Sequence, residues 1–241
     1  MCGRYVNPDE AAIERAWHIG RHNNDPIRRR FNVQPTSTIP VLRLHPETRE
    51  LELVAARWGL IPHWWKEARP PNFAFNARIE EAASKPLWRD ALRCTRCLVP
   101  AEGWYEWQAH ERTAAVAGKA RRYKQPFFVR RRDRRLLCFA GLLARPSAAD
   151  SGEPAWSCAI LTTAAAGGLA RIHDRMPVAT PDAVHAAWLE PGLKDGTQAI
   201  DAIRSTGWRD EFEYYAVSAL VNDGRVDGPE LVAPLNAADV D

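Results

Sequence analysis

The chain has 241 residues, of which 46% are hydrophobic and ten are tryptophan, enough apolar material for a sizeable core. No stretch approaches the roughly 18 apolar residues of a membrane helix, and no export signal opens the sequence. Five cysteines, an odd number without such a signal, predict reduced thiols in the cytoplasm. We expect one domain over residues 1–241, with a core of about 2–234, because no linker or repeat interrupts the chain.

Charge is unevenly distributed, although the formal net charge is only +3. Residues 1–175 contain 29 Lys and Arg against 18 Asp and Glu, a net of +11, whereas residues 176–241 contain 4 against 12, a net of −8. Only five of the 33 basic residues are lysine, and arginine suits bidentate phosphate contacts and stacking on bases. A GC-rich genome also raises arginine content, but the asymmetry favours an anionic partner for the first part.

The first third of the chain predicts a capped helix, a hairpin and an unusual aromatic loop. The expected elements are a helix after Asp9 that ends by Gly20, a polar loop over 20–32, a turn over 31–35, hairpin strands over 39–44 and 51–58, and a loop over 58–78. Closely spaced prolines exclude regular helix and central strand from the last segment. Long ordered loops of this kind usually serve a function.

The remainder of the chain predicts short helices mixed with strands. The expected elements are helices over 79–83 and 87–92, strands over 97–101 and 104–108, a polar loop over 109–124, a hairpin of strands over 127–131 and 136–144, a loop over 147–154, a buried strand over 156–163, helices over 164–171, 181–189 and 197–205, and a strand over 212–218. Helices and strands do not alternate regularly, and the strands come in hairpins. This pattern favours a mainly antiparallel α+β fold.

The amino terminus carries the most unusual chemistry. If Met1 is removed, Cys2 presents an α-amino group and a thiol on one residue, with reference pKa values of about 7.7–8.0 and about 8.5. Such an aminothiol condenses with an aldehyde to a Schiff base and then closes a thiazolidine ring. Arg4 supplies a cation that would favour the thiolate or bind an anion. The alternative is an unremarkable thiol near a frayed terminus.

Three interior motifs are candidates for further chemistry. Asn76 and Arg78 can hydrogen-bond a substrate and bind a phosphate, although such a motif taken alone more often forms a turn. His173, between a turn and a proline, is suited to proton transfer near pH 7, although a lone histidine is more often structural. Both motifs are therefore candidates whose role depends on what the fold places beside them.

The third motif is the strand segment Gly103-Trp104-Tyr105-Glu106-Trp107. Along a strand, Trp104 and Glu106 share one face, and Tyr105 and Trp107 share the other. A carboxyl between bulky rings is desolvated, which raises its pKa toward the range of proton exchange. The alternative is a surface strand with an exposed glutamate.

Metal and cofactor motifs are weak by comparison. Cys94 and Cys97 have the spacing of metal ligands, but no second close pair completes a four-ligand set. The chain has no phosphate-binding glycine loop, no dinucleotide fingerprint and no serine nucleophile elbow. The sequence therefore predicts neither a metal nor a cofactor.

Taken together, the motifs resemble one family. The order is Met1-Cys2-Gly3-Arg4, Phe31-Asn32-Val33-Gln34-Pro35-Thr36, Trp58-Gly59-Leu60-Ile61-Pro62 with Trp64-Trp65, Asn76-Ala77-Arg78, Gly103-Trp104-Tyr105-Glu106-Trp107, Ile172-His173-Asp174-Arg175-Met176-Pro177, and Val217-Ser218 with Val221-Asn222. It closely resembles the SRAP family (SOS response-associated peptidases), from Met1 to about Pro234. The segment from Arg78 to Pro86 looks shorter than the family pattern, and residues 109–124 have no clear counterpart.

The resemblance implies a single α+β domain on a barrel-like sheet and an enzyme of abasic-site repair. Cys2 would lose Met1, possibly with autoproteolysis, and crosslink to the aldehyde of an abasic site in single-stranded DNA. Asn76 would hold Cys2 and the opened sugar, Glu106 would move protons to the amine and assist Met1 removal, and His173 would help to open the sugar. The DNA-binding set that the resemblance implies is Arg4, Pro35, Trp64, Trp65, Arg78, Trp107 and Arg175.

The same resemblance implies a cytoplasmic monomer that associates with the nucleoid when it acts, on single strands or on junctions between single and double strands. Stacking adds about 1–3 kcal/mol per base in single-strand binding, which suits the aromatic loop. Two alternatives stay open at this point. One is a thiol peptidase acting in trans, and the other is a non-catalytic module that binds single-stranded DNA.

Overall fold

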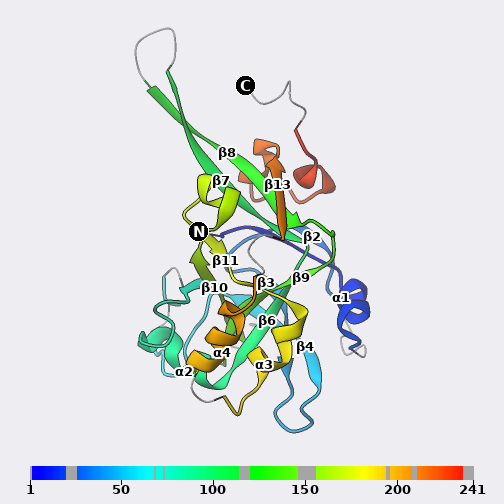
Figure 1. Cartoon of the computed structure of the whole chain (residues 1–241), viewed down its shortest axis with the longest axis vertical. Helices are drawn as coiled ribbons and strands as arrows, with labels where there is room; N and C mark the ends of the chain where they lie inside the picture. The colour runs from blue at the N-terminus through cyan, green and yellow to red at the C-terminus, as the bar shows by residue number, and fades with distance from the viewer. Residues whose placement is uncertain are drawn as a thin grey trace.

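A computed structural model describes residues 2–19, 26–67, 69–72, 74–113, 120–145, 156–193, 196–207 and 211–235, and its strands form two sheets (Figure 1). The five-stranded sheet has the order β13-β8-β7-β1-β2, and the eight-stranded sheet has the order β11-β10-β4-β3-β6-β9-β12 with β5 paired to β10. The strands are β1 (Tyr5–Asn7), β2 (Arg30–Val33), β3 (Thr38–Leu44), β4 (Leu51–Trp58), β5 (Asn76–Arg78), β6 (Arg96–Ala101), β7 (Gly103–Thr113), β8 (Ala120–Arg131), β9 (Leu137–Ala144), β10 (Ser157–Ala164), β11 (Arg175–Pro177), β12 (Ala179–Thr180) and β13 (Phe212–Ala216).

The larger sheet bends into a barrel-like ring. β10 pairs with β4 on one side and with β9 on the other, so the path β10-β4-β3-β6-β9 returns to β10. The pairs β3–β4, β3–β6, β6–β9 and β9–β10 are antiparallel, whereas β10 is parallel to β4 and β5. The expected α+β fold with a mainly antiparallel, barrel-like sheet is confirmed.

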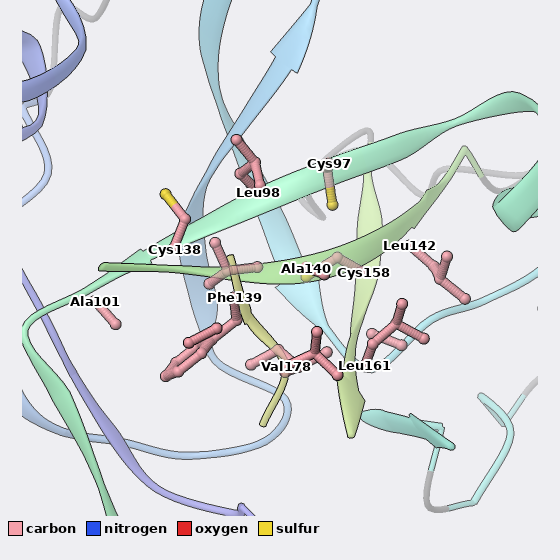
Figure 2. Packing of buried hydrophobic residues seen from close by; sticks show 14 of the residues in the cluster. Cys97, Leu98, Ala101, Cys138, Phe139, Ala140, Leu142, Cys158, Leu161 and Val178 are labelled. Atoms are coloured by element: carbon pink, nitrogen blue, oxygen red, sulfur yellow. The ribbon is translucent and has the colours of Figure 1, made fainter. Parts of the chain in front are cut away.

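The main core lies against both faces of this ring, where β6, β9 and β10 contribute almost continuous runs of buried residues. Figure 2 shows Leu98 and Cys138 directed to one side of the strands, and Cys97 and Phe139 directed to the other. Such runs are typical of strands covered on both faces. Burying each large apolar side chain contributes about 1.5–3 kcal/mol, so these strands dominate the stability of the fold.

Short helices cover the ring and its ends (Figure 1). They are α1 (Glu10–Trp17), α2 (Pro86–Cys94), α3 (His185–Leu189) and α4 (Gly196–Arg204), with 3₁₀ turns η1 (Gly167–Arg171), η2 (Asp182–Val184), η4 (Ala219–Asn222) and η5 (Pro229–Val232). Helix α1 begins where Asp9 Oδ1 accepts the Ala12 amide at 2.8 Å, and it ends at His18, whose φ is 55°. None of the described helices is long and apolar enough to cross a membrane.

Most of the predicted elements are present. The capped helix, the β3–β4 hairpin, the irregular aromatic loop, the buried strand β10 and the helices after residue 180 are confirmed. The loop expected over 147–154 lies outside the described residues. The segment 164–171 is helical only from Gly167, as the 3₁₀ turn η1.

Four predictions are wrong, and each error has a tertiary cause. Residues 31–33 continue strand β2 rather than turning, because β1 supplies hydrogen bonds to them. Residues 79–83 form turns, not a helix, and the helix begins at Pro86. The polar segment 109–124 is largely strand, in a ladder between β7 and β8. Strands β8 and β9 belong to different sheets, so the hairpin expected over 127–144 does not form.

Candidate active site around the amino-terminal cysteine

Strand β1 brings the beginning of the chain beside β7. Tyr5 lies opposite Trp104 in an antiparallel register, and the Tyr105 amide donates to the Arg4 carbonyl at 3.0 Å. Because β1 is antiparallel to β7, the chain before Tyr5 runs back toward Cys2 alongside the segment of β7 that leads to Glu106. Cys2 is 0% exposed, so this residue is part of the core.

Asn76 fixes the position of Cys2 from the larger sheet. Its Nδ2 donates to the Cys2 carbonyl at 2.7 Å. Asn76 is the first residue of β5 and lies opposite Ile160 of β10, so the ring sets where this amide stands. Asn76 Oδ1 is buried and has no hydrogen-bond donor among the described residues. Buried polar atoms are normally paired, so Oδ1 is an acceptor suited to a substrate hydroxyl.

Glu106 is buried in strand β7. It is only 3% exposed, which excludes the interpretation as an exposed glutamate on a surface strand. Trp104 packs in the main core, whereas Tyr105 and Trp107 pack in a second cluster, as strand alternation predicts. Loss of water around the carboxyl raises the pKa of Glu106 to about 8; Asp174 adds to the rise, and the positive amino terminus opposes it.

His173 lies in a turn that engages its Nδ1 atom. The Arg175 amide lies 3.0 Å from Nδ1, and Asp174 Oδ1 also lies 3.0 Å from it. Nδ1 accepts from the amide in one tautomer and donates to the carboxylate in the other. Burial, followed by the positive amino terminus, lowers the pKa of His173. The imidazole is therefore neutral at pH 7, and Nε2 is its ring nitrogen for proton exchange.

The thiol of Cys2 is protonated in this environment. Burial and the nearby Glu106 carboxylate raise its pKa well above the usual range. The expected thiolate stabilisation by Arg4 is wrong, because the Arg4 guanidinium donates to Asn32 Oδ1 at 2.7 Å and to the Val221 carbonyl at 2.5 Å. Arg4 therefore ties the amino terminus to the 3₁₀ turn η4.

A pocket of about 420 Å³ opens beside these groups. Its lining residues are Glu106, Trp107, Lys124, His173 and Asn222. Trp107 Nε1 donates to Asn222 Oδ1 at 2.8 Å, which fixes both side chains at the wall. The sequence analysis gave no role to Lys124 or Asn222. Lys124 fell in the segment expected to be a loop, and Asn222 stood only at the end of a motif.

The arginines expected to bind DNA have different environments. Arg78 is exposed, with 58% of its side chain accessible and a long 3.8 Å pair to Glu81. Arg175 is mostly buried and forms a bidentate pair with Glu80 at 3.0 and 2.8 Å. Arg78 is thus accessible to a phosphate as it stands, whereas Arg175 would have to exchange partners.

The aromatic residues expected to bind DNA do not all meet at one place. Trp107 lines the pocket with Glu106, whereas Trp64 lines a separate groove of about 290 Å³. Trp64 is 41% exposed, and its ring centroid is 5.9 Å from that of half-buried Trp65. Pro35 is half-buried just after β2.

Cys94 and Cys97, which have the spacing of metal ligands, lie in different environments. Cys94 is exposed at the end of α2, whereas Cys97 is buried in the core. Within the part of the chain that the structure describes, no three His, Cys, Asp or Glu residues are grouped as metal ligands.

Comparison with known proteins assigns the same region to a recognised family. The family described as "SOS response associated peptidase (SRAP)" matches residues 1–224. The abasic site processing protein YoqW of Bacillus subtilis is 32% identical over 96% of this chain and 99% of its own. The abasic site processing protein YedK of Escherichia coli is 30% identical over 98% of this chain and 100% of its own.

More distant relatives and a solved structure agree. The abasic site processing protein HMCES of Pongo abelii is 29% identical over 86% of this chain and 65% of its own. A crystal structure of a protein from Bacteroides thetaiotaomicron superposes with a TM-score of 0.72 over 98% of this chain and 100% of that one, at 21% identity. This last likeness supports the fold alone.

Proposed function

Because the chain belongs to the SOS response associated peptidase (SRAP) family, we propose that it processes abasic sites in single-stranded DNA through a covalent thiazolidine link to Cys2. Relatives that match over nearly their whole length are named abasic site processing proteins. An abasic nucleotide in its open form presents an aldehyde, which is the partner that an amino-terminal aminothiol captures.

One observation carries the proposal. Cys2 is fully buried, Asn76 donates to its carbonyl at 2.7 Å, and Glu106 is close enough for its ionised form to raise the pKa of the Cys2 thiol. Glu106 also shares the pocket with His173. Ordering and burying the residues at the beginning of the chain, beside two titratable groups, costs free energy. This cost is explained if the amino terminus takes part in a reaction.

Removal of Met1 is the first step. Cys2 Sγ attacks the Met1 carbonyl, forming a thioester as the bond to the Cys2 nitrogen breaks, and water then hydrolyses the thioester. The departing nitrogen needs a proton, and Glu106, with a pKa of about 8, is protonated at neutral pH and donates it, while the proton that Sγ loses restores the Glu106 carboxyl. The products are free methionine and a chain that begins with the Cys2 amine.

Capture of the aldehyde follows with the amine as the first nucleophile. The amine adds to the aldehyde carbon, the resulting hydroxyl leaves as water with a proton from Glu106, and the nitrogen then returns a proton to Glu106 to give the neutral imine. Cys2 Sγ then adds to the imine carbon, and its proton passes to the nitrogen. The sum is aldehyde plus aminothiol giving thiazolidine plus one water. The raised pKa of the thiol keeps it protonated until this last addition.

His173 and Asn76 assist at the sugar. A neutral imidazole accepts a proton from the anomeric hydroxyl as the bond to the ring oxygen breaks, and it passes the proton to that oxygen, which gives the open-chain aldehyde and a hydroxyl. The unpaired Asn76 Oδ1 accepts a hydrogen bond from a hydroxyl of the opened sugar. Both roles rest on the neutral state of His173 and on the fixed position of Asn76.

The test uses the full chain and single-stranded DNA with one abasic site, followed by denaturing electrophoresis and intact mass. We expect a shifted band whose protein part lacks Met1. Cys2→Ala removes the band, and the matched control Cys94→Ala retains it, because Cys94 is the exposed thiol of α2. A band that survives Cys2→Ala, or none with wild type, contradicts the proposal.

The two alternatives are less well supported. A peptidase acting in trans must admit a foreign peptide to its thiol, whereas the Cys2 thiol is fully buried, and the chain itself places Met1 next to Cys2. A non-catalytic binding module gives no reason to bury Glu106 beside the terminus. Turnover of unrelated peptides, or DNA protection by Cys2→Ala equal to wild type, would revive one or the other.

A further inference from the structure

Strands β7 and β8 extend beyond the two sheets as a two-stranded arm (Figure 1). Their register is continuous from Trp104 opposite Val129 to Thr113 opposite Ala120. β1 and β13 pair with the arm only near its base. A two-stranded ribbon is marginally stable alone, so the outer part of the arm is not explained by stability.

The outer part of the arm is basic. Residues 107–126 contain five Lys and Arg against one acid, Glu111, a net of +4. Lys124 is exposed, and it also lines the pocket that contains Glu106. The sequence of the arm is therefore basic, and its exposed Lys124 brings a positive charge to the pocket of the candidate active site, where it could attract nucleic acid.

A row of contacts fixes an aromatic pair on this arm. Gln108 Nε2 donates to the Arg171 carbonyl at 2.9 Å, and Gln108 Oε1 lies 3.0 Å from His110 Nε2. The His110 ring stacks on Tyr123 with centroids 5.1 Å apart and planes at 16°. Tyr123 remains 40% exposed. The pair is thus held in place from η1, near His173, while part of the Tyr123 ring faces water.

We propose that Tyr123, backed by His110, is a stacking platform for an unpaired base that flanks the abasic nucleotide, and that Lys124 contacts a neighbouring phosphate. The choice of DNA as ligand rests on the proposed function. His110 is four positions beyond Glu106 on β7, a distance of about 13 Å along the strand at ~3.3 Å per residue. Four stacked nucleotides at ~3.4 Å each span about the same length. Aromatic rings interleaved with cations are the recognition mode of single strands.

The first test measures stacking without chemistry. The probe is a single strand with a tetrahydrofuran abasic analogue, which has no aldehyde, and 2-aminopurine placed one to five nucleotides away on either side. Wild type is expected to quench one position within about four nucleotides. Tyr123→Ala removes the quench and weakens binding about 5- to 100-fold, whereas Tyr123→Phe retains both.

The second test measures the phosphate contact. Lys124→Gln is expected to make the slope of log K against log salt about 0.7 less negative, the value for one phosphate of a single strand. Arg49→Gln is the control, because Arg49 lies at the β3–β4 turn, where it pairs with Glu190 at 2.8 Å, and it leaves the slope unchanged.

Wild-type affinity and quench in Tyr123→Ala would overturn the platform, as would equal losses on a duplex without an unpaired base. These readouts are independent of crosslinking. If wild type forms no crosslink but Tyr123→Ala still loses the quench, the proposed function fails and the platform stands. If wild type crosslinks and Tyr123→Ala binds as wild type does, the platform alone fails.

Discussion

Four cysteines are fully buried, and they divide into two regions with different neighbours. Cys97, Cys138 and Cys158 lie on strands of the ring, where burial raises the pKa of each thiol. Cys2 is equally buried, and its pKa is raised too, but Asn76 and Glu106 act on it. Burial alone therefore makes an inert thiol. The amide, the acid and the terminal position distinguish the site from the core.

The largest expected difference between the regions is in chemistry. Cys2→Ala removes the abasic-site crosslink completely, because no other thiol has an α-amino group beside it. Cys138→Ala retains the crosslink and instead lowers the free energy of unfolding by about 1–2 kcal/mol, through lost packing. Denaturing gels and urea unfolding on both variants measure the contrast. A normal crosslink in Cys2→Ala would remove the distinction.

Glu106→Gln sharpens the role of the acid. We expect single-turnover crosslinking to fall about 10²- to 10⁴-fold, the usual range for one general acid. Glu106 loses its proton as pH rises through about 8, so the wild-type rate should decline above that pH. The variant should lack this decline and keep only the acidic limb of the Cys2 amine. Identical pH profiles would show that Glu106 carries no proton in the reaction.

The same variant tests what burial of the acid costs the fold. The folded pKa of about 8 exceeds the reference value of 4.5, so the folded state holds a proton that the unfolded state releases between these pH values. Stability is therefore greatest below pH 4.5 and falls as pH rises to about 8, by at most about 5 kcal/mol. Glu106→Gln should gain stability over wild type at pH 8 and lose that advantage near pH 5, measured by urea unfolding. An advantage independent of pH would contradict the assignment.

Asn76→Ala tests how the ring positions the terminus. Loss of the 2.7 Å bond to the Cys2 carbonyl should slow crosslinking about 10- to 100-fold, because small misplacements of reacting groups are costly. The free energy of unfolding should fall by about 1 kcal/mol. Asn72→Ala, on an exposed residue of the same loop, should leave the rate unchanged. Equal rates in both variants would separate Asn76 from the chemistry.

The smallest effect is expected from Glu80→Gln, which releases Arg175. The pair is partly exposed on the Glu80 side, so unfolding should become easier by only about 1 kcal/mol. If Arg175 contacts phosphate, its release should tighten binding of single-stranded DNA at low salt. Anisotropy titrations measure this, and weaker binding would assign Arg175 a purely structural role.

Features set by neighbouring residues are predicted from the sequence better than contacts between residues far apart in the chain. Alternation along one strand placed Trp104 and Trp107 on opposite faces, and the proline-rich loop excluded regular structure. The arm was missed because the residues from Gln108 to Thr113 lack an apolar alternation and include few strand-forming types. The partners of Arg4 and Arg175 lie 28 and 95 residues away in the chain. Only the assembled sheets bring such pairs together.

The most direct measurement is peptide mapping of the crosslink by mass spectrometry after nuclease digestion. The account predicts that the DNA remnant is on the amino-terminal Cys2 peptide, that Met1 is absent, and that the added mass is the open sugar aldehyde minus one water. A remnant on Lys124 or any other side chain, or a crosslinked peptide that retains Met1, would contradict it.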